Sequence, residues 1–264
     1  MDLRLKGKKA VVTGSTAGIG FAIANELAAE GATVVINGRT EKRIENAIGE
    51  IRKSHPGAQL SGAAADVSNA EGCARLIAAV SEVDVLINNM GIFEPKAFEE
   101  IPDADWQRMF EANVMSGVRL SRHYLAGMRR KNWGRIIFIS SESGVQIPAE
   151  MVHYGMSKTA QIAVARGIAE TVAGTGITVN SVLPGPTRSE GVESFLAQMG
   201  RKGGADAATI EAEFFKSVRP SSLLKRFATS EEVAHAVVYL SSPLASATNG
   251  AAMRVDGGVV RAIL

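Results

Sequence analysis

The segment Thr13-Gly14-Ser15-Thr16-Ala17-Gly18-Ile19-Gly20 stands between a β-branched run, Lys9 to Thr13, and an apolar helical pattern from Ile19 to Glu30. Glycines at such a junction let the chain turn tightly and approach a pyrophosphate, whose charge the amides and dipole of the helix N-terminus favour. A glycine cluster at the first strand-to-helix junction is moderately specific for a dinucleotide, although three residues stand here where the common G-x-G-x-x-G form has one. The residues predicted to bind this cofactor are Gly14, Ser15, Gly18, Ile19 and Gly20.

Short β-branched runs alternate with helical patterns along most of the chain. The predicted strands are 9–13, 33–37, 60–65, 83–88, 135–140, 178–183 and 252–256. The predicted helices are 19–30, 41–53, 70–80, 103–117, 119–131, 151–173 and 230–240. Strands that alternate with helices and look buried on both faces require a parallel sheet with helices on either side. The predicted fold class is therefore α/β, a doubly wound sheet of about seven strands in a single domain over residues 1–264.

Composition and charge argue against several classes of protein. With 264 residues, 46% of them hydrophobic and 21% charged, the chain is long enough to bury a core without a covalent staple. The net charge of +2, without a run of like charges, makes nucleic acid and anionic membranes poor candidates for partners. The single cysteine, Cys73, excludes an internal disulfide and a thiolate-rich metal cluster, and no metal site is predicted.

The sequence shows no targeting or membrane segment. No stretch has the roughly 18 to 20 apolar residues needed to span a bilayer. Residues Met1 to Lys9 lack the apolar core of a signal peptide. A cytoplasmic location is therefore the expectation.

The segment from Ser189 to Ser222 does not fit the alternation of strands and helices. Its pattern is helical but broken by glycines, and it follows the sixth predicted strand. An insertion there would lie over the carboxyl edge of the sheet, where ligands bind in open α/β folds. We predict a helical substrate lid at about 189–222; the alternative is a helical pair that only packs against a neighbour. Its apolar residues, which either face a substrate or pack in the core, include Phe195, Met199, Phe214 and Phe215.

The end of the second predicted strand bears on the choice of cofactor. A carboxylate there would accept hydrogen bonds from the ribose hydroxyls of NAD, whereas an arginine pairs with the 2′-phosphate of NADP. The sequence reads Asn37-Gly38-Arg39-Thr40, with no carboxylate at the strand tip and then an arginine. It favours NADP(H) over NAD(H), unless Arg39 is only a solvated residue that opens the next helix.

The third and fourth strands end in residues suited to a cofactor crevice. Asp66 and Val67 follow the third strand, where Asp66 either accepts a hydrogen bond from the adenine amino group or caps the next helix. After the fourth strand, Gly91 would let the chain pass close to a ribose. Asn88 and Asn89 would tie neighbouring strand ends together.

The fifth strand ends in Ser140-Ser141-Glu142-Ser143-Gly144 and the sixth in Pro184-Gly185-Pro186-Thr187. The second of these loops is a rigid turn suited to the nicotinamide end of the cofactor. Its predicted contacts are Pro184, Gly185 and Thr187. Each strand end alone is an ordinary loop, but their joint position on one edge is what a cofactor crevice requires.

Tyr154 and Lys158 stand four residues apart in the pattern that predicts a helix from Met151 to Ala173. Positions four apart share one face of a helix, so the phenol and the ammonium would point into the same space. A cation beside a phenol lowers its pKa from about 10, which would make Tyr154 a general acid or base at a carbinol or carbonyl. Taken alone, a Tyr and a Lys at this common spacing are more often two surface residues of a helix without a chemical role.

Taken together, these motifs resemble those of the short-chain dehydrogenase/reductase family over nearly the whole chain, from Leu5 to Gly258. The motifs that carry the resemblance are Thr13-Gly14-x-x-x-Gly18-Ile19-Gly20, Asn88-Asn89-Met90-Gly91, Asn113, Ser141, Tyr154-x-x-x-Lys158 and Pro184-Gly185. The resemblance implies a Rossmann-like sheet of order 3-2-1-4-5-6-7 and a homotetramer or homodimer. It also implies hydride transfer between a nicotinamide cofactor and a carbonyl or secondary alcohol.

The resemblance implies roles for four residues. Tyr154 would be the catalytic acid/base, and Ser141 would position and polarise the substrate oxygen. Lys158 would hold the nicotinamide ribose and lower the pKa of Tyr154, and Asn113 would kink its helix and anchor a water in a proton relay. Met90 stands where the family usually has alanine, which puts the fit of that loop in question.

Within the family, the chain is similar to the 3-oxoacyl-[acyl-carrier-protein] reductases. The net charge of +2 and the absence of an evident basic patch give no support for docking of an acidic carrier protein. One alternative is an NAD-dependent alcohol or sugar dehydrogenase. Another is a non-catalytic NADP-binding sensor, which we would expect to have lost a catalytic residue, and none is lost here.

Overall fold

The computed structural model of the protein describes residues 2–188 and 207–263. Seven strands form one sheet in which every neighbouring pair is parallel, in the order β3-β2-β1-β4-β5-β6-β7. The strands are β1 (Lys9–Val12), β2 (Thr33–Gly38), β3 (Leu60–Ala64), β4 (Val85–Asn88), β5 (Gly134–Ile139), β6 (Ile177–Pro184) and β7 (Ala252–Val255). The predicted doubly wound α/β fold and its strand order are confirmed.

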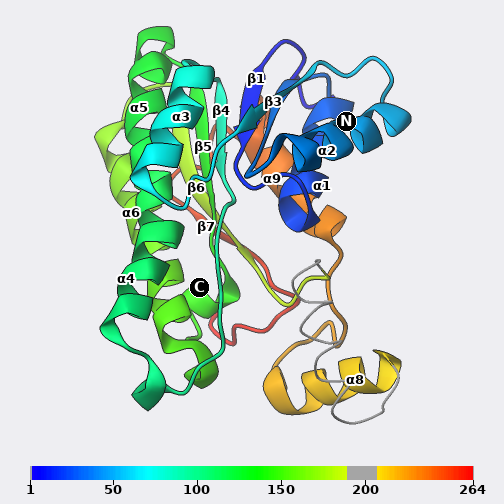
Figure 1. Cartoon of the computed structure of the whole chain (residues 1–264), viewed down its shortest axis with the longest axis vertical. Coiled ribbons are helices and arrows are strands. Elements are labelled where there is room, and N and C mark those ends of the chain that lie inside the picture. The colour runs from blue at the N-terminus through cyan, green and yellow to red at the C-terminus, as the bar shows by residue number, and fades with distance from the viewer. Residues whose placement is uncertain (1, 189–206, 264) are drawn as a thin grey trace.

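Helices cover both faces of this sheet (Figure 1). The α-helices are α1 (Gly18–Ala29), α2 (Glu41–Ser54), α3 (Ala70–Ala79), α4 (Asp103–Phe110), α5 (Ser116–Lys131), α6 (Val152–Thr171), α8 (Ala207–Glu213) and α9 (Ser230–Ser241). Short 3-10 helices occur at Phe98–Glu100, Glu142–Gly144, Ala149–Met151 and Pro243–Ala245, and π-helical turns at Glu111–Met115 and Phe214–Val218. Helices α1, α2 and α9 pack on one face of the sheet, and α3, α5 and α6 on the other.

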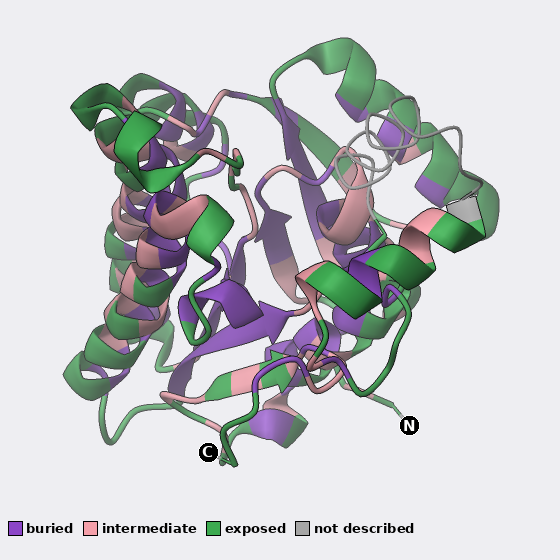
Figure 2. Ribbon diagram, turned by 90° about the horizontal axis from the view of Figure 1, so that it is seen from below, coloured by how far each residue is buried: buried purple, intermediate pink, exposed green. Residues whose placement is uncertain are grey.

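The core has two parts because side chains along a strand alternate between its faces. In β1, Ala10 and Val12 pack beneath α1, α2 and α9, whereas Val11 packs beneath α3, α5 and α6. All three side chains are fully buried. Figure 2 shows the central strands as a buried layer between more exposed helices. A sheet covered on both faces explains why its central strands are apolar throughout rather than alternating.

The chain from 103 to 131 differs from the predicted pair of helices with a break near Val118. In the structure, α4, the π-helical turn Glu111–Met115 and α5 follow one another without a gap. The irregularity is centred on Asn113, whose carbonyl accepts a hydrogen bond from Gln161 Nε2 at 2.7 Å and is thereby drawn out of the regular helical ladder. The other predicted elements agree with the structure to within two residues at each end.

The predicted lid at 189–222 lies only partly within the described residues. Residues 189–206, which include Phe195 and Met199, lie outside them. The remainder contains α8 and the π-helical turn Phe214–Val218, so its helical pattern is confirmed there. Among the described residues, no helix is long and apolar enough to cross a bilayer.

Candidate active site

The turn between β1 and α1 has the backbone that the glycine cluster predicts. Gly14 and Gly18 have φ values of +61° and +55°, in the left-handed region that favours glycine. A Cβ atom on Gly20 would lie 2.4 Å from Asn89 Nδ2 and 2.5 Å from Gly14 O, so only glycine fits there. The N-cap of α1, Ala17, provides no side-chain hydrogen bond, and the first turn has no acidic residue. The amides of this turn therefore fit the pyrophosphate of a dinucleotide.

Asparagines hold the ends of neighbouring strands together at this edge of the sheet. Asn89 Nδ2 donates to Thr13 O at 2.8 Å and to Gly14 O at 3.2 Å, as predicted. Asn88 differs from the prediction, because its Nδ2 donates instead to Ser121 Oγ of α5 at 3.1 Å. Asn37, which the sequence did not single out for this role, accepts from Gly14 N at 3.2 Å and links β2 to β3.

Three of the predicted cofactor residues have side chains that are hydrogen-bonded to, or packed against, other residues of the protein. Ser15 is fully buried, its Oγ donates to Val12 O at 2.7 Å, and its amide donates to Asn37 O. Val67 is buried in the core beneath α3. Asp66 Oδ1 accepts from Ser68 N at 3.1 Å, whereas α3 is capped by Asn69, which corrects the alternative that Asp66 caps this helix. Arg39 is exposed just beyond β2.

A cavity of about 680 Å³ lies where the strand ends and the segment before α9 meet. The predicted residues that line it are Ile19, Asn89, Gly91, Ser141, Tyr154, Lys158, Pro184, Gly185 and Thr187. They come from the start of α1, the loops after β4 and β5, the end of β6 with the loop that follows it, and α6, so the structure brings residues far apart in sequence into one space. Met90 does not line this cavity but packs against the core beneath α3 and α5.

The loop after β6 is held tightly at the wall of this cavity. A Cβ atom on Gly185 would lie 2.5 Å from Asp256 O, so glycine is required by close backbone packing. Thr187 Oγ1 donates to Gly185 O at 2.9 Å, and Thr187 pairs with Ala228 in an isolated parallel bridge. These contacts place the loop after β6 in the wall of the cavity.

Tyr154 and Lys158 lie on the same side of α6 and line the same cavity, as predicted, and the ammonium lies over the phenol ring. Lys158 Nζ lies 5.6 Å from the centre of the Tyr154 ring and donates to Ile139 O at 2.9 Å and Gln161 Oε1 at 3.1 Å. Burial lowers the pKa of Lys158 to about 7, because the ammonium is withdrawn from water and has no carboxylate partner among the residues that the structure describes.

The pKa of Tyr154 is raised, which contradicts the prediction that the nearby Lys158 cation lowers it. Burial is the main cause, and the charge of Glu142 adds to it. A hydrogen bond with Ser141 and the charge of Arg219 act in the opposite direction. The helical spacing correctly predicted that Tyr154 and Lys158 lie on one side of α6. The Lys158 side chain, however, is hydrogen-bonded to the end of β5, and the charge nearest in effect to the phenol is that of Glu142.

Asn113 connects Lys158 to the loop after β4. Its Oδ1 accepts from Ile92 N at 2.7 Å, and its Nδ2 donates to Ile92 O and Ser157 Oγ, both at 2.9 Å. Its carbonyl is bound by Gln161, which in turn accepts from Lys158. The predicted irregularity at Asn113 is thus confirmed as a π-helical turn. Gln161 was missed, although it stands three residues after Lys158 on the same helix face.

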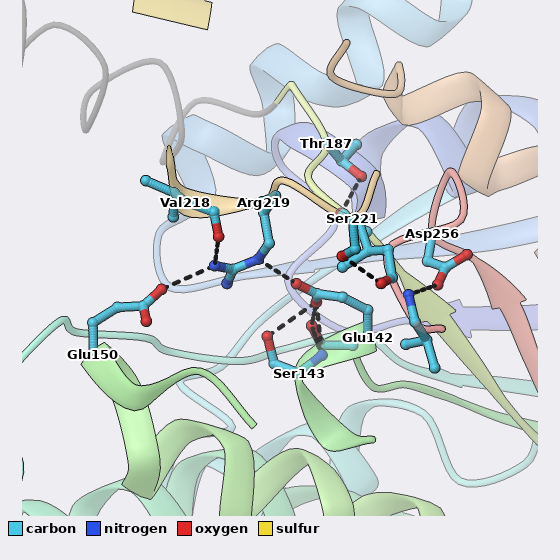
Figure 3. A network of polar contacts seen from close by, with 12 residues as sticks. Glu142, Ser143, Glu150, Thr187, Val218, Arg219, Ser221 and Asp256 are labelled. Atoms are coloured by element: carbon cyan, nitrogen blue, oxygen red, sulfur yellow. Dashed lines mark hydrogen bonds and ion pairs between the residues drawn. The ribbon is translucent and has the colours of Figure 1, made fainter. Parts of the chain in front are cut away.

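A charged network beside Ser141 was also missed by sequence reasoning (Figure 3). The Glu142 side chain is buried and pairs with Arg219, whose Nε lies 3.0 Å from Glu142 Oε1. Arg219 Nη1 lies 3.0 Å from Glu150 Oε1. Glu142 directly follows the predicted catalytic serine, but no local pattern connects it with an arginine 77 residues away.

Phe214 and Phe215 of the lid segment differ in their surroundings, for which facing a substrate and packing in the core were the two predictions. Phe214 lines the cavity. Phe215 is 3% exposed and packs in an aromatic cluster with Phe214 and Phe227, with ring centres 5.0 to 5.1 Å apart. Phe227 also lines the cavity, so this cluster forms an apolar part of its wall.

Comparison with known proteins agrees with this arrangement. A family model described as short chain dehydrogenase matches residues 8–200. The chain is 50% identical over 263 residues to "Uncharacterized oxidoreductase YvaG" of Bacillus subtilis, with all of both chains covered. It is 30% identical to a 3-oxoacyl-[acyl-carrier-protein] reductase of Aquifex aeolicus, over 98% of this chain and 100% of that one. The crystal structure of L-sorbose reductase from Gluconobacter frateurii, complexed with NADPH and L-sorbose, matches with a TM-score of 0.92 at 32% identity over 100% of both chains.

Proposed function

Because this chain belongs to the short-chain dehydrogenase family, we propose that it is an NADP(H)-dependent oxidoreductase that transfers a hydride between the nicotinamide and a carbonyl or secondary alcohol. The observation that carries the proposal is the shared cavity. Ser141, Tyr154 and Lys158 line the same space as six of the predicted cofactor residues, namely Ile19, Asn89, Gly91, Pro184, Gly185 and Thr187. A hydroxyl, a phenol and an amine at the carboxyl edge of a parallel sheet are the groups that such a transfer needs.

The reduction that we propose takes a hydride from NADPH and a proton from the Tyr154 hydroxyl, and it yields NADP⁺ and an alcohol. Ser141 donates a hydrogen bond to the substrate oxygen as negative charge develops there. Lys158 holds the nicotinamide ribose with the N–H groups of its Nζ. Asn113 fixes the loop after β4 and, through Gln161, the position of Lys158.

The choice of NADP(H) is supported by the end of β2. Arg39 is exposed there, directly after Gly38, and no carboxylate ends this strand. A guanidinium binds a phosphate with two parallel hydrogen bonds, whereas NAD has no phosphate at this place. The NADPH complex of the L-sorbose reductase supports the same choice.

An absorbance assay at the nicotinamide band tests the proposal. The purified protein is mixed with NADPH and a panel of ketones, ketoses and acyl thioesters, and the reverse direction is tested with NADP⁺ and the matching alcohols. We expect NADPH consumption with at least one member of the panel and much weaker activity with NADH. Tight binding of NADPH without turnover of any panel member would support a nucleotide sensor instead.

Two features of the architecture belong to the proposal. The described part of the predicted lid, residues 207–222, contributes Phe214, Val218 and Arg219 to the cavity wall, which supports a lid role for this part of the chain. The chain assembles as a homotetramer or homodimer, which is supported by the half-exposed strand β7 at the open edge of the sheet. Light scattering after size-exclusion chromatography tests the second feature.

A further inference from the structure

Charged side chains in the wall of the cavity bear on the kind of substrate that fits there. Within the part of the chain that the structure describes, they are Glu142, Glu150, Lys158 and Arg219. Lys158 is held at the end of β5 by its hydrogen bond to Ile139 O, and the proposed function assigns it to the cofactor. The other three form one network beside Ser141, the residue to which the proposed function assigns the substrate oxygen (Figure 3).

The Glu142 carboxylate lies directly beside the Ser141 hydroxyl. Glu142 is 4% exposed, and its Oε2 accepts from Ser141 Oγ at 2.5 Å. The same carboxylate also accepts from Ser143 N at 2.7 Å, from Ser143 Oγ at 3.0 Å and from Arg219 Nε at 3.0 Å. Because these three donors hold the carboxylate, the Ser141 proton can turn from Glu142 to a bound carbonyl oxygen, as the proposed reaction requires.

The position of the Ser141 hydroxyl sets the distance between a substrate and Glu142. A carbonyl oxygen that accepts from Ser141 at about 2.8 Å lies no more than about 5 Å from Glu142 Oε2. In a short keto acid, one or two carbons separate the carbonyl from the carboxylate, which would therefore lie within about 10 Å of Glu142. This distance is comparable to the Debye length of about 8 Å, and charges in a partly buried site are screened less than exposed ones. Glu142 would thus repel the carboxylate of such a substrate.

Arg219 does not offset this repulsion, because both neighbouring carboxylates already pair with it. Its Nε donates to Glu142 Oε1 at 3.0 Å, and its Nη1 donates to Glu150 Oε1 at 3.0 Å and to Val218 O at 2.9 Å. The Arg219 side chain is 11% exposed, so these contacts fill much of its surroundings. One guanidinium between two carboxylates leaves the network with an excess of one negative charge.

Glu150 brings part of this excess charge to a more open part of the cavity wall. It belongs to the 3-10 helix Ala149–Met151, and its backbone carbonyl accepts from Lys96 N at 3.0 Å. Its side chain is 45% exposed, whereas Glu142 is buried. Water screens an exposed charge more than a buried one, so Glu150 should act on a bound ligand more weakly than Glu142.

We propose that Glu142 and Glu150 determine the substrate class: the site takes carbonyl compounds, and the alcohols made from them, that carry no carboxylate or phosphate. The inference rests on the proposed function and deepens it, because the reaction class leaves the charge of the substrate open. Phe93, Met151 and Val218 also line the cavity and provide apolar contacts for an uncharged substrate. A keto acid or a sugar phosphate would instead bring a second anion to a network that already has an excess negative charge.

Matched pairs of a keto acid and its methyl ester test the proposal, because the two members differ mainly in charge. The probes are acetoacetate and levulinate with their methyl esters, each reduced with NADPH at pH 7. We expect the wild type to have a kcat/KM for the ester at least tenfold higher than for the acid. The ratio of ester to acid should fall about tenfold in Glu142→Gln and about threefold in Glu150→Gln.

The matched control is Glu82→Gln. The Glu82 side chain is 46% exposed and pairs with Arg130, much as Glu150 pairs with Arg219, but it does not line the cavity. This variant changes the net charge of the protein by the same amount and should leave the ratio of ester to acid in place. If Glu142→Gln fails to fold, Glu150→Gln compared with Glu82→Gln decides the question.

Binding is measured separately from turnover by saturation-transfer NMR. The NADPH complex of Tyr154→Phe, in which we expect reduction to be too slow to consume the ligand, is compared with the same complex after addition of Glu142→Gln or Glu150→Gln. We expect the ester to bind more tightly than the acid, and the acid to gain affinity in both glutamine variants by the factors given for kcat/KM.

Four results would overturn the proposal. The first is an acid that the wild type binds as tightly as its ester, and the second is a preference for the acid, which would show that Arg219 binds a substrate carboxylate. The third is equal ratios in the wild type and both cavity variants, and the fourth is binding of neither member of any pair. A wild type that binds the esters but reduces no carbonyl refutes the proposed function, while the binding ratio still decides the role of the two glutamates.

Discussion

The pKa of Lys158 makes a quantitative prediction about stability. Lys158 is 4% exposed, and the pKa of its amine is lowered from 10.5 to about 7 in the folded protein. Between these values the unfolded chain binds a proton that the folded protein does not, so stability increases as the pH rises from about 7 toward 10.5. Below pH 7 both states are protonated, and the full cost of burying the ammonium is present.

Substitution of Lys158 by methionine removes this dependence. The unfolded wild type binds up to one proton more than the folded protein between pH 7 and pH 9, and each such pH unit is worth about 1.4 kcal/mol. Over this range the free energy of unfolding of the wild type should therefore rise by about 2 kcal/mol relative to that of Lys158→Met. The variant also leaves Ile139 O and Gln161 Oε1 without this donor, but that cost does not vary with pH. For a chain of this length the gain corresponds to about 4 °C in Tm.

Urea denaturation of both proteins at pH 7, 8 and 9, without nucleotide, measures the effect. Groups other than Lys158 titrate in both proteins and cancel in the difference. The control is Lys53→Met, which removes a lysine whose side chain is 71% exposed. Parallel stability curves for the wild type and Lys158→Met from pH 7 to pH 9 would show that the amine is not desolvated, and the reasoning would be wrong.

Three further substitutions test the site. Tyr154→Phe should lower kcat by about 10²- to 10⁴-fold with NADPH binding still measurable by fluorescence, and a near-normal rate would remove Tyr154 from the mechanism. Arg39→Ala should raise the KM for NADPH by about tenfold but hardly change that for NADH, since only the former carries the 2′-phosphate; equal changes would contradict this role. Gly20→Ala should abolish nucleotide binding, because its Cβ would lie 2.4 Å from Asn89 Nδ2 and 2.5 Å from Gly14 O; unchanged affinity would show that the turn can relax.

The fold and the location of the site were predictable from local patterns. Alternating apolar strands and helices specify a parallel sheet, and the carboxyl ends of parallel strands meet at one edge. Thus Gly14, Asn89, Ser141 and Gly185, which follow four different strands, were placed together before any contact was known. The positive φ values at Gly14 and Gly18 were likewise implied by a tight turn that only glycine accepts at low cost.

The electrostatics of the site were decided only by the tertiary structure. Helical spacing puts Tyr154 and Lys158 on one side of α6, but rotamers and neighbouring acceptors direct Lys158 to Ile139 O and Gln161. The pairing of Glu142 with Arg219 joins segments 77 residues apart, and periodicity contains no information about such a contact. The amino-acid sequence by itself determined the sheet, its edge and the register of the reactive groups, because these follow from local geometry. Which charges face the phenol depends on how the segment after β6 folds back over the strand ends, and only the packed chain decides that.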